Sequence, residues 1–314
     1  MAPTILVVGA TGNTGRGVVT TLSKLLPSIA SFSGHKIIAL TRSSSGAEAQ
    51  KLATLPHVEV VKYNWVDITP EWLQERNIVR VFIAPHAQPN QFSEESAFHV
   101  AALHGGVEYV VRISTTAPNV RPDCKAFYPR SHWAIEALLS SPEFNRLRWT
   151  SLQPNVFTSF ILGPASTFVK EFRKTGKQGP LRLVSSEDAP VGIVDANDVA
   201  VFAAHLLVED DTTKHNKAKY VLNGPEDITG RQIVELIEKE IGTKVEEVHF
   251  KDMSFLEWLV NQPTSESKSI ILSMRYAVES AWAGLCTAST TSKAVLELAA
   301  PEVTPAEYFK TMLS

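Results

Sequence analysis

Three glycines at intervals of three follow a short apolar segment near the start of the chain. Residues 5–8 are apolar, and the next seven are Gly9-Ala10-Thr11-Gly12-Asn13-Thr14-Gly15. Such a loop directs the N–H groups of the following helix at a pyrophosphate. Gly9 would allow the tight turn, Gly12 would admit the phosphates and Gly15 would let helix and strand pack closely. The spacing predicts a dinucleotide site, although a glycine-rich turn without a ligand is the alternative. The predicted contacts in this loop are Gly9, Thr11, Gly12, Asn13, Thr14 and Gly15.

The end of the second predicted strand indicates which dinucleotide binds. Residues 36–41 form this strand, and Arg42, Ser43 and two further serines follow it. An acidic residue here would bind the ribose 2′-hydroxyl and repel a 2′-phosphate, but none is present. Arg42 and Ser43 offer a positive charge and a hydroxyl, which suit a phosphate. We therefore expect NADP(H) rather than NAD(H); an ordinary solvated arginine is the alternative.

Further cofactor contacts are expected where later strands end, because ligands of parallel sheets bind at the carboxyl edge. Asn64 and Trp65 would lie beside the adenine, and His86 would face a ribose or the substrate unless it is merely solvated. The Ser114 hydroxyl would bind a ribose or a substrate oxygen, or would only cap its strand. The candidates at these strand ends are Asn64, Trp65, Ala84, His86, Ser114, Pro154, Asn155 and Val156.

Tyr128 and His132 are four residues apart at the start of a predicted helix, so they share one face. Reduction of a carbonyl needs a proton, and a tyrosine with a pKa near ~10 is a poor donor without a nearby cation. Histidine titrates near ~6.5 and could polarise Tyr128 or donate directly. We take Tyr128, His132 and Ser114 as candidate catalytic residues. Alternatively, His132 packs beside Trp133 and Tyr128 points to solvent or closes the pocket.

Alternating strands and helices must position these residues. The predicted strands are 5–8, 36–41, 58–63, 79–84, 107–113 and 148–152, and the predicted helices between them include 47–55, 91–103 and 128–139. This alternation requires parallel pairing and right-handed crossovers. We therefore predict an α/β fold with a doubly wound parallel Rossmann sheet.

The pattern changes after Phe157. A long apolar helix is predicted over 157–172, and shorter helices and strands follow to the end of the chain. We expect residues 1–155 to form the NADP(H)-binding domain and residues 156–314 a smaller α/β cap that supplies the substrate pocket. Residues 190–210 are expected to return to the main sheet.

Composition narrows the class of protein. The chain has 314 residues, 44% hydrophobic and 20% charged, which permits one large α/β domain or slightly more. Lysine and arginine number 30 against 33 acidic residues, so no basic excess suggests nucleic acid. Cys124 and Cys286 are too few for a disulfide framework and fit a reducing compartment.

Membrane segments and metal sites are not predicted. No apolar stretch approaches the ~20 residues of a membrane-spanning helix. The first apolar run is a strand that ends in glycine rather than a signal peptide. We expect a cytoplasmic protein that acts on a small molecule, with neither nucleic acid nor membrane as partner; its oligomeric state stays open.

The chain resembles the NmrA-like group of atypical short-chain dehydrogenases/reductases over most of its length. The resemblance rests on the glycine loop, Thr41-Arg42 and residues 132–136, 153–157 and 194–200. Within this group the sequence is similar to fungal members, some of which act in specialised metabolism. More distantly, it is similar to festuclavine dehydrogenases and to isoflavone and phenylcoumaran reductases. The resemblance implies a Rossmann fold that binds NADP(H).

The chain departs from these relatives at the candidate acid. The Y-x-x-x-K pair of ordinary short-chain dehydrogenases is not intact, because His132 stands where the lysine would be. The helix lysine of the plant reductases is also missing, and Tyr128 falls near its position. Asn64 stands where many relatives have an aspartate beside the adenine.

Three functions stay open at this point. The leading hypothesis is an NADPH-dependent reductase that transfers hydride to a small, mostly apolar metabolite with an activated C=C, C=N or C=O bond. The family also contains NADP(H)-sensing regulators that act through a protein partner, and a non-redox isomerase on the same scaffold is a further possibility. An apolar cavity above the nicotinamide would favour the reductase over the regulator.

Overall fold

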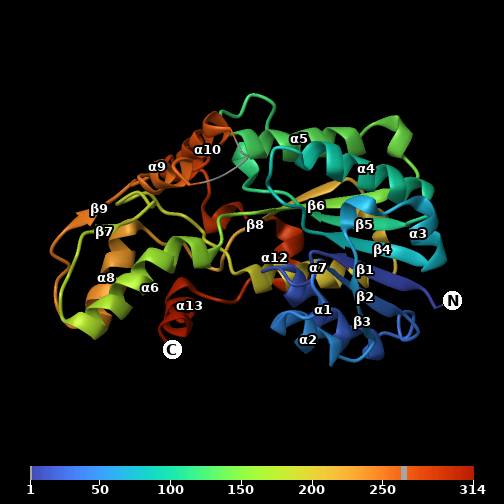
Figure 1. Ribbon diagram of the computed structural model, residues 1–314, viewed down its shortest axis with the longest axis horizontal. Helices are drawn as coiled ribbons and strands as arrows, with labels where there is room; N and C mark the ends of the chain where they lie inside the picture. Colours follow the sequence, from blue (N-terminus) through green and yellow to red (C-terminus); the bar gives the residue numbers. More distant parts are fainter. Residues whose placement is uncertain (1, 263–266) are drawn as a thin grey trace.

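The computed structural model describes residues 2–262 and 267–314. Its main element is a seven-stranded, entirely parallel sheet with the order β3-β2-β1-β4-β5-β6-β8 (Figure 1). The strands are β1 (Thr4–Val8), β2 (Lys36–Thr41), β3 (Val58–Lys62), β4 (Ile78–Ile83), β5 (Tyr109–Ile113), β6 (Arg148–Pro154) and β8 (Ala218–Leu222). The strand order reverses at β1, which opens a ligand crevice at the carboxyl ends of β1 and β4. The predicted doubly wound Rossmann sheet is confirmed.

Helices cover both faces of the sheet, so its central strands are apolar on both sides. Ile5 and Val7 belong to one core cluster, and Leu6 and Val8 to the other, because successive strand residues point to opposite faces. One face carries α1 (Gly15–Leu25), α2 (Ala47–Ala53), α7 (Ala196–Leu207) and α12 (Lys293–Ala299). The other carries α3 (Pro70–Glu75), α4 (Gln91–His104) and α5 (Phe127–Leu139).

The helix ends follow the local sequence signals. Thr69 caps α3 by accepting from the Trp72 N–H, with Pro70 in the first turn. Asp195 caps α7 in the same way through the Asn197 N–H. Thr229 forms a full capping box at the start of α8 (Gly230–Ile241).

A smaller α/β region lies beside the carboxyl edge of the sheet, on the left of Figure 1. Its elements are α6 (Thr158–Thr175), β7 (Leu181–Arg182), α8, β9 (Val248–His249), α9 (Phe255–Val260), α10 (Lys268–Ser273), α11 (Glu279–Trp282) and α13 (Pro305–Leu313). β7 and β9 pair in parallel, with Leu181 beside Val248 and Arg182 beside His249. A third apolar cluster joins α6, α8 and α13.

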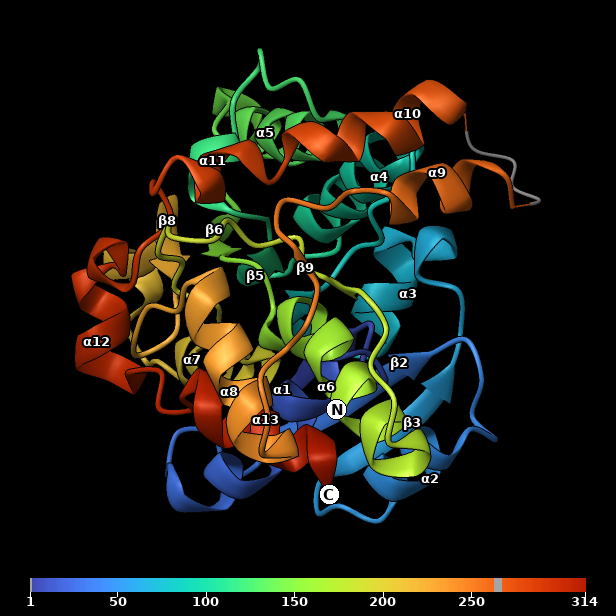
Figure 2. The ribbon, with the colours of Figure 1, turned by 90° about the vertical axis from the view of Figure 1, so that its left-hand side faces the viewer.

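The C-terminal segment crosses back to α5 over the carboxyl edge, and Figure 2 shows α10 and α11 beside that helix. The Phe127 N–H donates to the Ser273 hydroxyl at 3.1 Å, and the Asn119 amide donates to the Ala277 carbonyl at 2.7 Å. These contacts fasten the C-terminal segment to the start of α5 and to the loop before it.

More of the C-terminal half joins the main sheet than residues 190–210. A Cβ on Gly17 of α1 would lie only 2.7 Å from the Ala200 Cβ, so α7 packs tightly against α1. β8 pairs with β6, and Val295 of α12 belongs to the core on the α1 face. Among the residues that the structure describes, no helix is long and apolar enough to cross a bilayer.

Candidate dinucleotide and substrate site

The glycine loop adopts a tight turn between β1 and α1. Gly9 has a φ of 78°, a left-handed conformation that favours glycine. A Cβ on Gly9 would also lie 3.1 Å from the Ala84 carbonyl oxygen at the end of β4. The Gly12 N–H donates to the Gly9 carbonyl at 2.9 Å, which closes the turn.

Gly15 and Gly12 differ in what surrounds them. A Cβ on Gly15 would lie 2.1 Å from the Gly9 carbonyl oxygen, so the helix can approach the loop only if this residue is glycine. A Cβ on Gly12 would meet just that same oxygen, at 3.2 Å, and Gly12 is exposed together with Asn13. This geometry suits close packing at Gly15 and an approaching phosphate at Gly12. Thr14 precedes α1 and is buried.

The end of β2 lies against the glycine loop. The Thr41 hydroxyl accepts from the Ser43 N–H at 3.2 Å and lies 3.4 Å from the Thr11 hydroxyl. Arg42 is exposed and forms no hydrogen bond or ion pair with the described residues, so its guanidinium is available to an anion. Arg16 is equally exposed in the first turn of α1, and we did not predict it. Its signal in the sequence was a basic residue directly after the third glycine.

The adenine side of the crevice is bordered by Trp65 and His86. Trp65 packs against His86 with ring centroids 5.7 Å apart, and Asn64 beside it is exposed. His86 uses both ring nitrogens locally: Nε2 pairs with the Glu94 carboxylate at 2.5 Å, and Nδ1 accepts from the Gln88 N–H at 3.2 Å. His86 therefore offers a ligand its ring face rather than a nitrogen.

Asn155, a candidate residue directly after β6, links segments of the chain that are far apart in the sequence. The Asn155 amide donates to the carbonyls of Gly192 and Cys286 and to the Asn223 side-chain oxygen, at 2.9–3.0 Å. Its own oxygen accepts from the Val156 N–H at 2.8 Å. The Asn155 side chain is thus committed to internal bonds, and the predicted cofactor contact would have to come from elsewhere in Pro154–Val156.

An apolar cavity of about 120 Å³ lies beside the ends of β5 and β6. Its apolar wall includes Val156, Phe160, Met253, Phe255, Met274 and Trp282. None of its described lining residues carries a charged side chain. The Trp282 indole N–H donates to the Val184 carbonyl at 2.8 Å, so this ring presents only its apolar face.

Tyr128 and Thr116 also line this cavity, and both side chains carry a hydroxyl group. Burial raises the pKa of the Tyr128 phenol above its ordinary value, although a hydrogen bond with Thr115 acts in the opposite direction. Tyr128 therefore keeps its proton at neutral pH and can donate a hydrogen bond. The hydroxyl of Ser114 is buried at the end of β5 and forms no hydrogen bond within the described residues.

His132 is almost fully buried and belongs to a different environment from Tyr128. Its Nδ1 accepts a hydrogen bond from Arg112 Nη2 at 2.9 Å and another from Gln91 Nε2 at 3.2 Å. Burial and the Arg112 charge lower the pKa of His132 to about 3, so the imidazole is neutral at physiological pH. The Tyr128 and His132 rings meet edge to face with centroids 6.4 Å apart. This geometry does not support our expectation that His132 titrates near ~6.5 and supplies a proton.

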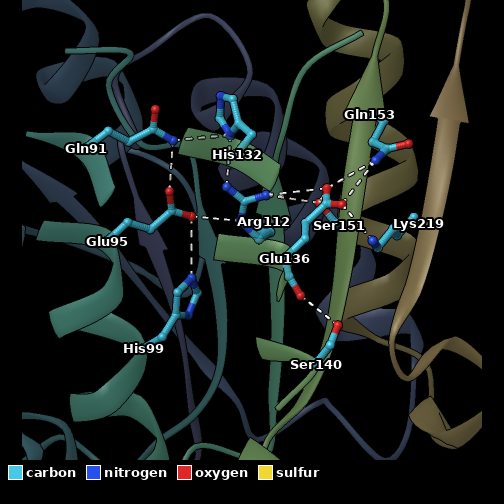
Figure 3. A network of polar contacts seen from close by, with 10 residues as sticks. All are labelled: Gln91, Glu95, His99, Arg112, His132, Glu136, Ser140, Ser151, Gln153 and Lys219. Carbon is cyan, nitrogen blue, oxygen red and sulfur yellow. Dashed lines mark hydrogen bonds and ion pairs between the residues drawn. The ribbon is translucent and has the colours of Figure 1, made fainter. Parts of the chain in front are cut away.

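Figure 3 shows the buried network that holds His132. Arg112 donates to Glu95 at 2.7 Å and lies 3.8 Å from Glu136, and Glu136 pairs with Lys219 at 3.0 Å. Burial alone would raise the pKa of Glu95, but Arg112 and His99 hold it well below its ordinary value. Sequence reasoning missed this network. Its one signal was a charged residue, Arg112, inside the apolar strand β5.

Within residues 2–262 and 267–314, no group of three histidine, cysteine, aspartate or glutamate side chains is arranged to hold a metal ion.

Known proteins share both the sequence pattern and the fold. A (4-alkanoyl-5-oxo-2,5-dihydrofuran-3-yl)methyl phosphate reductase of Streptomyces griseus is 28% identical over 238 residues, which cover 76% of this chain and 74% of that protein. An NADPH-dependent quinone oxidoreductase of Escherichia coli, solved with NADPH, superposes with a TM-score of 0.73 at 20% identity and covers 99% of this chain and 100% of its own. NmrA, a negative transcriptional regulator solved with NAD, superposes with a TM-score of 0.69 at 13% identity, covering 98% of this chain and 94% of its own.

At these identities the two solved structures show a shared fold, which reductases and a regulator both use. The family itself is shown by sequence, because the match to the NmrA-like family spans residues 1–295 of 314. The resemblance found in the sequence is confirmed: the chain belongs to the NmrA-like family.

Proposed function

We propose that the protein is an NADPH-dependent reductase of small, uncharged and mostly apolar molecules with an activated C=C, C=N or C=O bond. The observation that carries this proposal is the apolar cavity that Tyr128 lines, at the edge of the sheet where a Rossmann fold binds its cofactor. A cavity of this kind gives a small substrate a place beside the cofactor, which favours a reductase over a protein that only senses the dinucleotide.

The cofactor is NADP(H). Arg42 is exposed and unpaired among the described residues, at the strand end that meets the adenosine ribose. No acidic residue stands there to repel a 2′-phosphate. The Escherichia coli neighbour, which was solved with NADPH, agrees with this choice.

The substrate carries no charge on the part that enters the cavity. A buried charge requires a partner, and the described lining offers none. The Streptomyces griseus relative is named for a phosphate ester, whereas the lining residues that the structure describes include no cation to hold a phosphate. The two proteins would therefore differ in substrate class.

The chain's own residues orient the substrate and supply a hydrogen-bond donor. When bound, NADPH supplies the hydride. The Tyr128 hydroxyl would donate to the substrate atom on which negative charge develops, and the cavity walls would exclude water. The raised pKa of Tyr128 favours hydrogen bonding over early loss of its proton.

The test is turnover of a panel of quinones, enones, imines and aldehydes, followed by loss of NADPH absorbance. Ala281 lines the cavity, so Ala281→Trp should fill it and abolish turnover while NADPH affinity stays unchanged. The exposed Ala47 at the start of α2 provides the matched control, Ala47→Trp, which should behave like the parent protein. Tight NADPH binding with no turnover on any compound would favour the regulator instead.

A further inference from the structure

We infer that a second pocket beside the apolar cavity binds a small uncharged molecule that carries a hydroxyl or N–H group, with Gln153 Oε1 as the acceptor. This pocket lies where β6 and β8 end, and the proposed reduction does not use it. Its volume is about 200 Å³. One water molecule needs only roughly 10–15 Å³, so the pocket can hold a larger ligand.

Three segments that are far apart in the sequence form the walls of the second pocket. Residues 116–118 come from the loop after β5, Gln153 and Val221 come from the ends of β6 and β8, and Leu285 comes from the loop after α11. Leu285 is 55% exposed, so the pocket reaches the protein surface. None of its described lining residues carries a charged side chain.

Glu136 fixes the orientation of the Gln153 amide. Gln153 Nε2 donates to both carboxylate oxygens of Glu136, at 3.1 and 3.3 Å. Burial alone would raise the pKa of Glu136, but Arg112 and Lys219 hold it below its ordinary value. The carboxylate is therefore ionised and can only accept, so a rotated amide would place one oxygen against another. Gln153 Oε1 must point away from Glu136, as Figure 3 shows.

The oxygen Oε1 of Gln153 is available to a ligand. It has no hydrogen-bond partner within residues 2–262 and 267–314. Gln153 is only 7% exposed, yet this oxygen is not fully enclosed, in contrast to the unpaired oxygens of Gln91 and Ser114. Because Gln153 lines the second pocket, the accessible surface of Oε1 belongs there. Buried polar groups are normally paired, so this acceptor indicates a ligand that donates.

The other amide side chains on the walls are used internally. The Asn155 amide is bound to three oxygens, as described above. The Asn223 amide donates to the Thr290 hydroxyl at 3.0 Å, and that hydroxyl donates to the Thr287 carbonyl at 2.7 Å. Among the lining amides that the structure describes, Gln153 is therefore the one with an available acceptor.

The lining determines the class of ligand. An amide oxygen only accepts, so the ligand must bring a hydroxyl or an N–H group. A charged ligand would find no partner among the described lining residues, and an unpaired buried charge is unfavourable. The apolar side chains of the three wall segments suit a short hydrocarbon or aromatic body. A small alcohol, phenol or amide meets all of these conditions.

The second pocket is distinct from the apolar cavity. Among their described lining residues, the two share Thr116 and Asn155. Asn155 belongs to both walls, and its amide is held by the carbonyls of Gly192 and Cys286 at 3.0 and 2.9 Å. Because these bonds keep the shared wall in place, the ligand of the second pocket is a separate molecule rather than the far end of the substrate.

Benzyl alcohol and benzyl methyl ether test this assignment, because the ether lacks the donor. In methyl NMR spectra, Val221 and Leu285 report on the second pocket and Met253 reports on the apolar cavity. Benzyl alcohol should shift the Val221 and Leu285 signals and bind about tenfold more tightly than the ether, the usual effect of one hydrogen bond. Gln153→Met should remove this difference by weakening the binding of the alcohol alone.

Two variants should keep the tenfold difference. Gln50→Met is the matched control, because Gln50 is exposed on α2. Ala281→Trp, which fills the apolar cavity, should also bind like the parent protein. If Gln153→Met does not fold, Ala117→Trp decides, because it fills the second pocket and should abolish the Val221 and Leu285 shifts.

Several results would overturn the inference. Equal affinities of the parent protein for the alcohol and the ether would exclude the hydrogen bond, and unshifted Val221 and Leu285 signals would leave Oε1 to water. Equal losses for both ligands in Gln153→Met would show a structural role. Retained shifts in Ala117→Trp would place the ligand elsewhere, and loss of binding in Ala281→Trp would make the pocket part of the substrate cavity. These measurements involve no turnover, so they leave the reductase proposal to its own test.

Discussion

Arg112 Nη2 donates to His132 Nδ1 across 2.9 Å, between a central strand and the helix that begins at the cofactor edge. This one bond couples the buried charges of the sheet to the candidate active site. It keeps His132 neutral four residues beyond Tyr128. In the Y-x-x-x-K pair of ordinary short-chain dehydrogenases, a charged lysine stands at this position.

Arg42 should determine the choice of cofactor. A charged hydrogen bond to a phosphate contributes roughly 1.5–3 kcal/mol, or about ten- to a hundredfold in affinity. Arg42→Ala should weaken NADPH binding by that factor and leave NADH binding nearly unchanged in fluorescence titrations. Arg146→Ala is the control, because Arg146 is exposed and precedes β6, at the edge of the sheet where the parallel strands begin. Equal losses for both cofactors would remove Arg42 from the 2′-phosphate site.

The glycines of the loop should respond differently to substitution. Gly12→Val should abolish dinucleotide binding, because its side chain would occupy the place of the phosphates. The protein should stay folded, because a Cβ at this position would approach only the Gly9 carbonyl oxygen. Gly15→Ala should instead lower the melting temperature, because its Cβ would overlap the Gly9 carbonyl at 2.1 Å. Calorimetry and thermal unfolding of both variants separate the two effects. Tight NADPH binding by Gly12→Val would contradict the assignment of the loop.

Tyr128 should act in turnover rather than in binding. On a confirmed substrate, Tyr128→Phe should reduce kcat by roughly a hundredfold or more, the usual size of a general-acid effect, with NADPH affinity retained. Tyr308→Phe in α13 serves as the control. Turnover at the parent rate would place the proton donor elsewhere. An iminium substrate, which accepts hydride at carbon without a proton, would then be the better candidate.

Stability should fall at acidic pH because His132 and His99 are buried in their neutral forms. Burial lowers the pKa of both, to about 3 for His132, so the unfolded chain binds more protons than the folded one below its ordinary histidine pKa of ~6.5. Stability that is present above pH ~6.5 is therefore lost as the pH falls, for His132 until the pH reaches about 3, by up to ~1.4 kcal/mol per pH unit for one such group.

Urea unfolding at pH 7 and pH 5 measures this loss. His132→Gln should reduce the difference between the two pH values, because the variant lacks one of the two groups. The same substitution at the exposed His57 should leave the difference as it is in the parent protein. A parent protein equally stable at both pH values would contradict the burial of neutral histidines.

Local sequence patterns determined the Rossmann core and the glycine loop. An apolar strand, three spaced glycines and an apolar-periodic helix each depend on neighbours within a few residues, and the same holds for the caps at Thr69, Asp195 and Thr229. The absence of an acid beside Arg42 is likewise visible in the sequence alone. For this reason the fold and the cofactor could be predicted from the sequence alone.

Only the tertiary structure decided the state of His132 and the use of Asn155. His132 is set by Gln91 and Arg112, which come from other elements 41 and 20 residues away in the chain. Asn155 is bound by Gly192 and Cys286, and β8 joins the sheet far from its neighbour β6 in sequence. Burial and partner identity set the pKa and the free hydrogen-bonding atoms of a side chain. Both depend on which distant segments meet, and spacing along the chain does not contain that information.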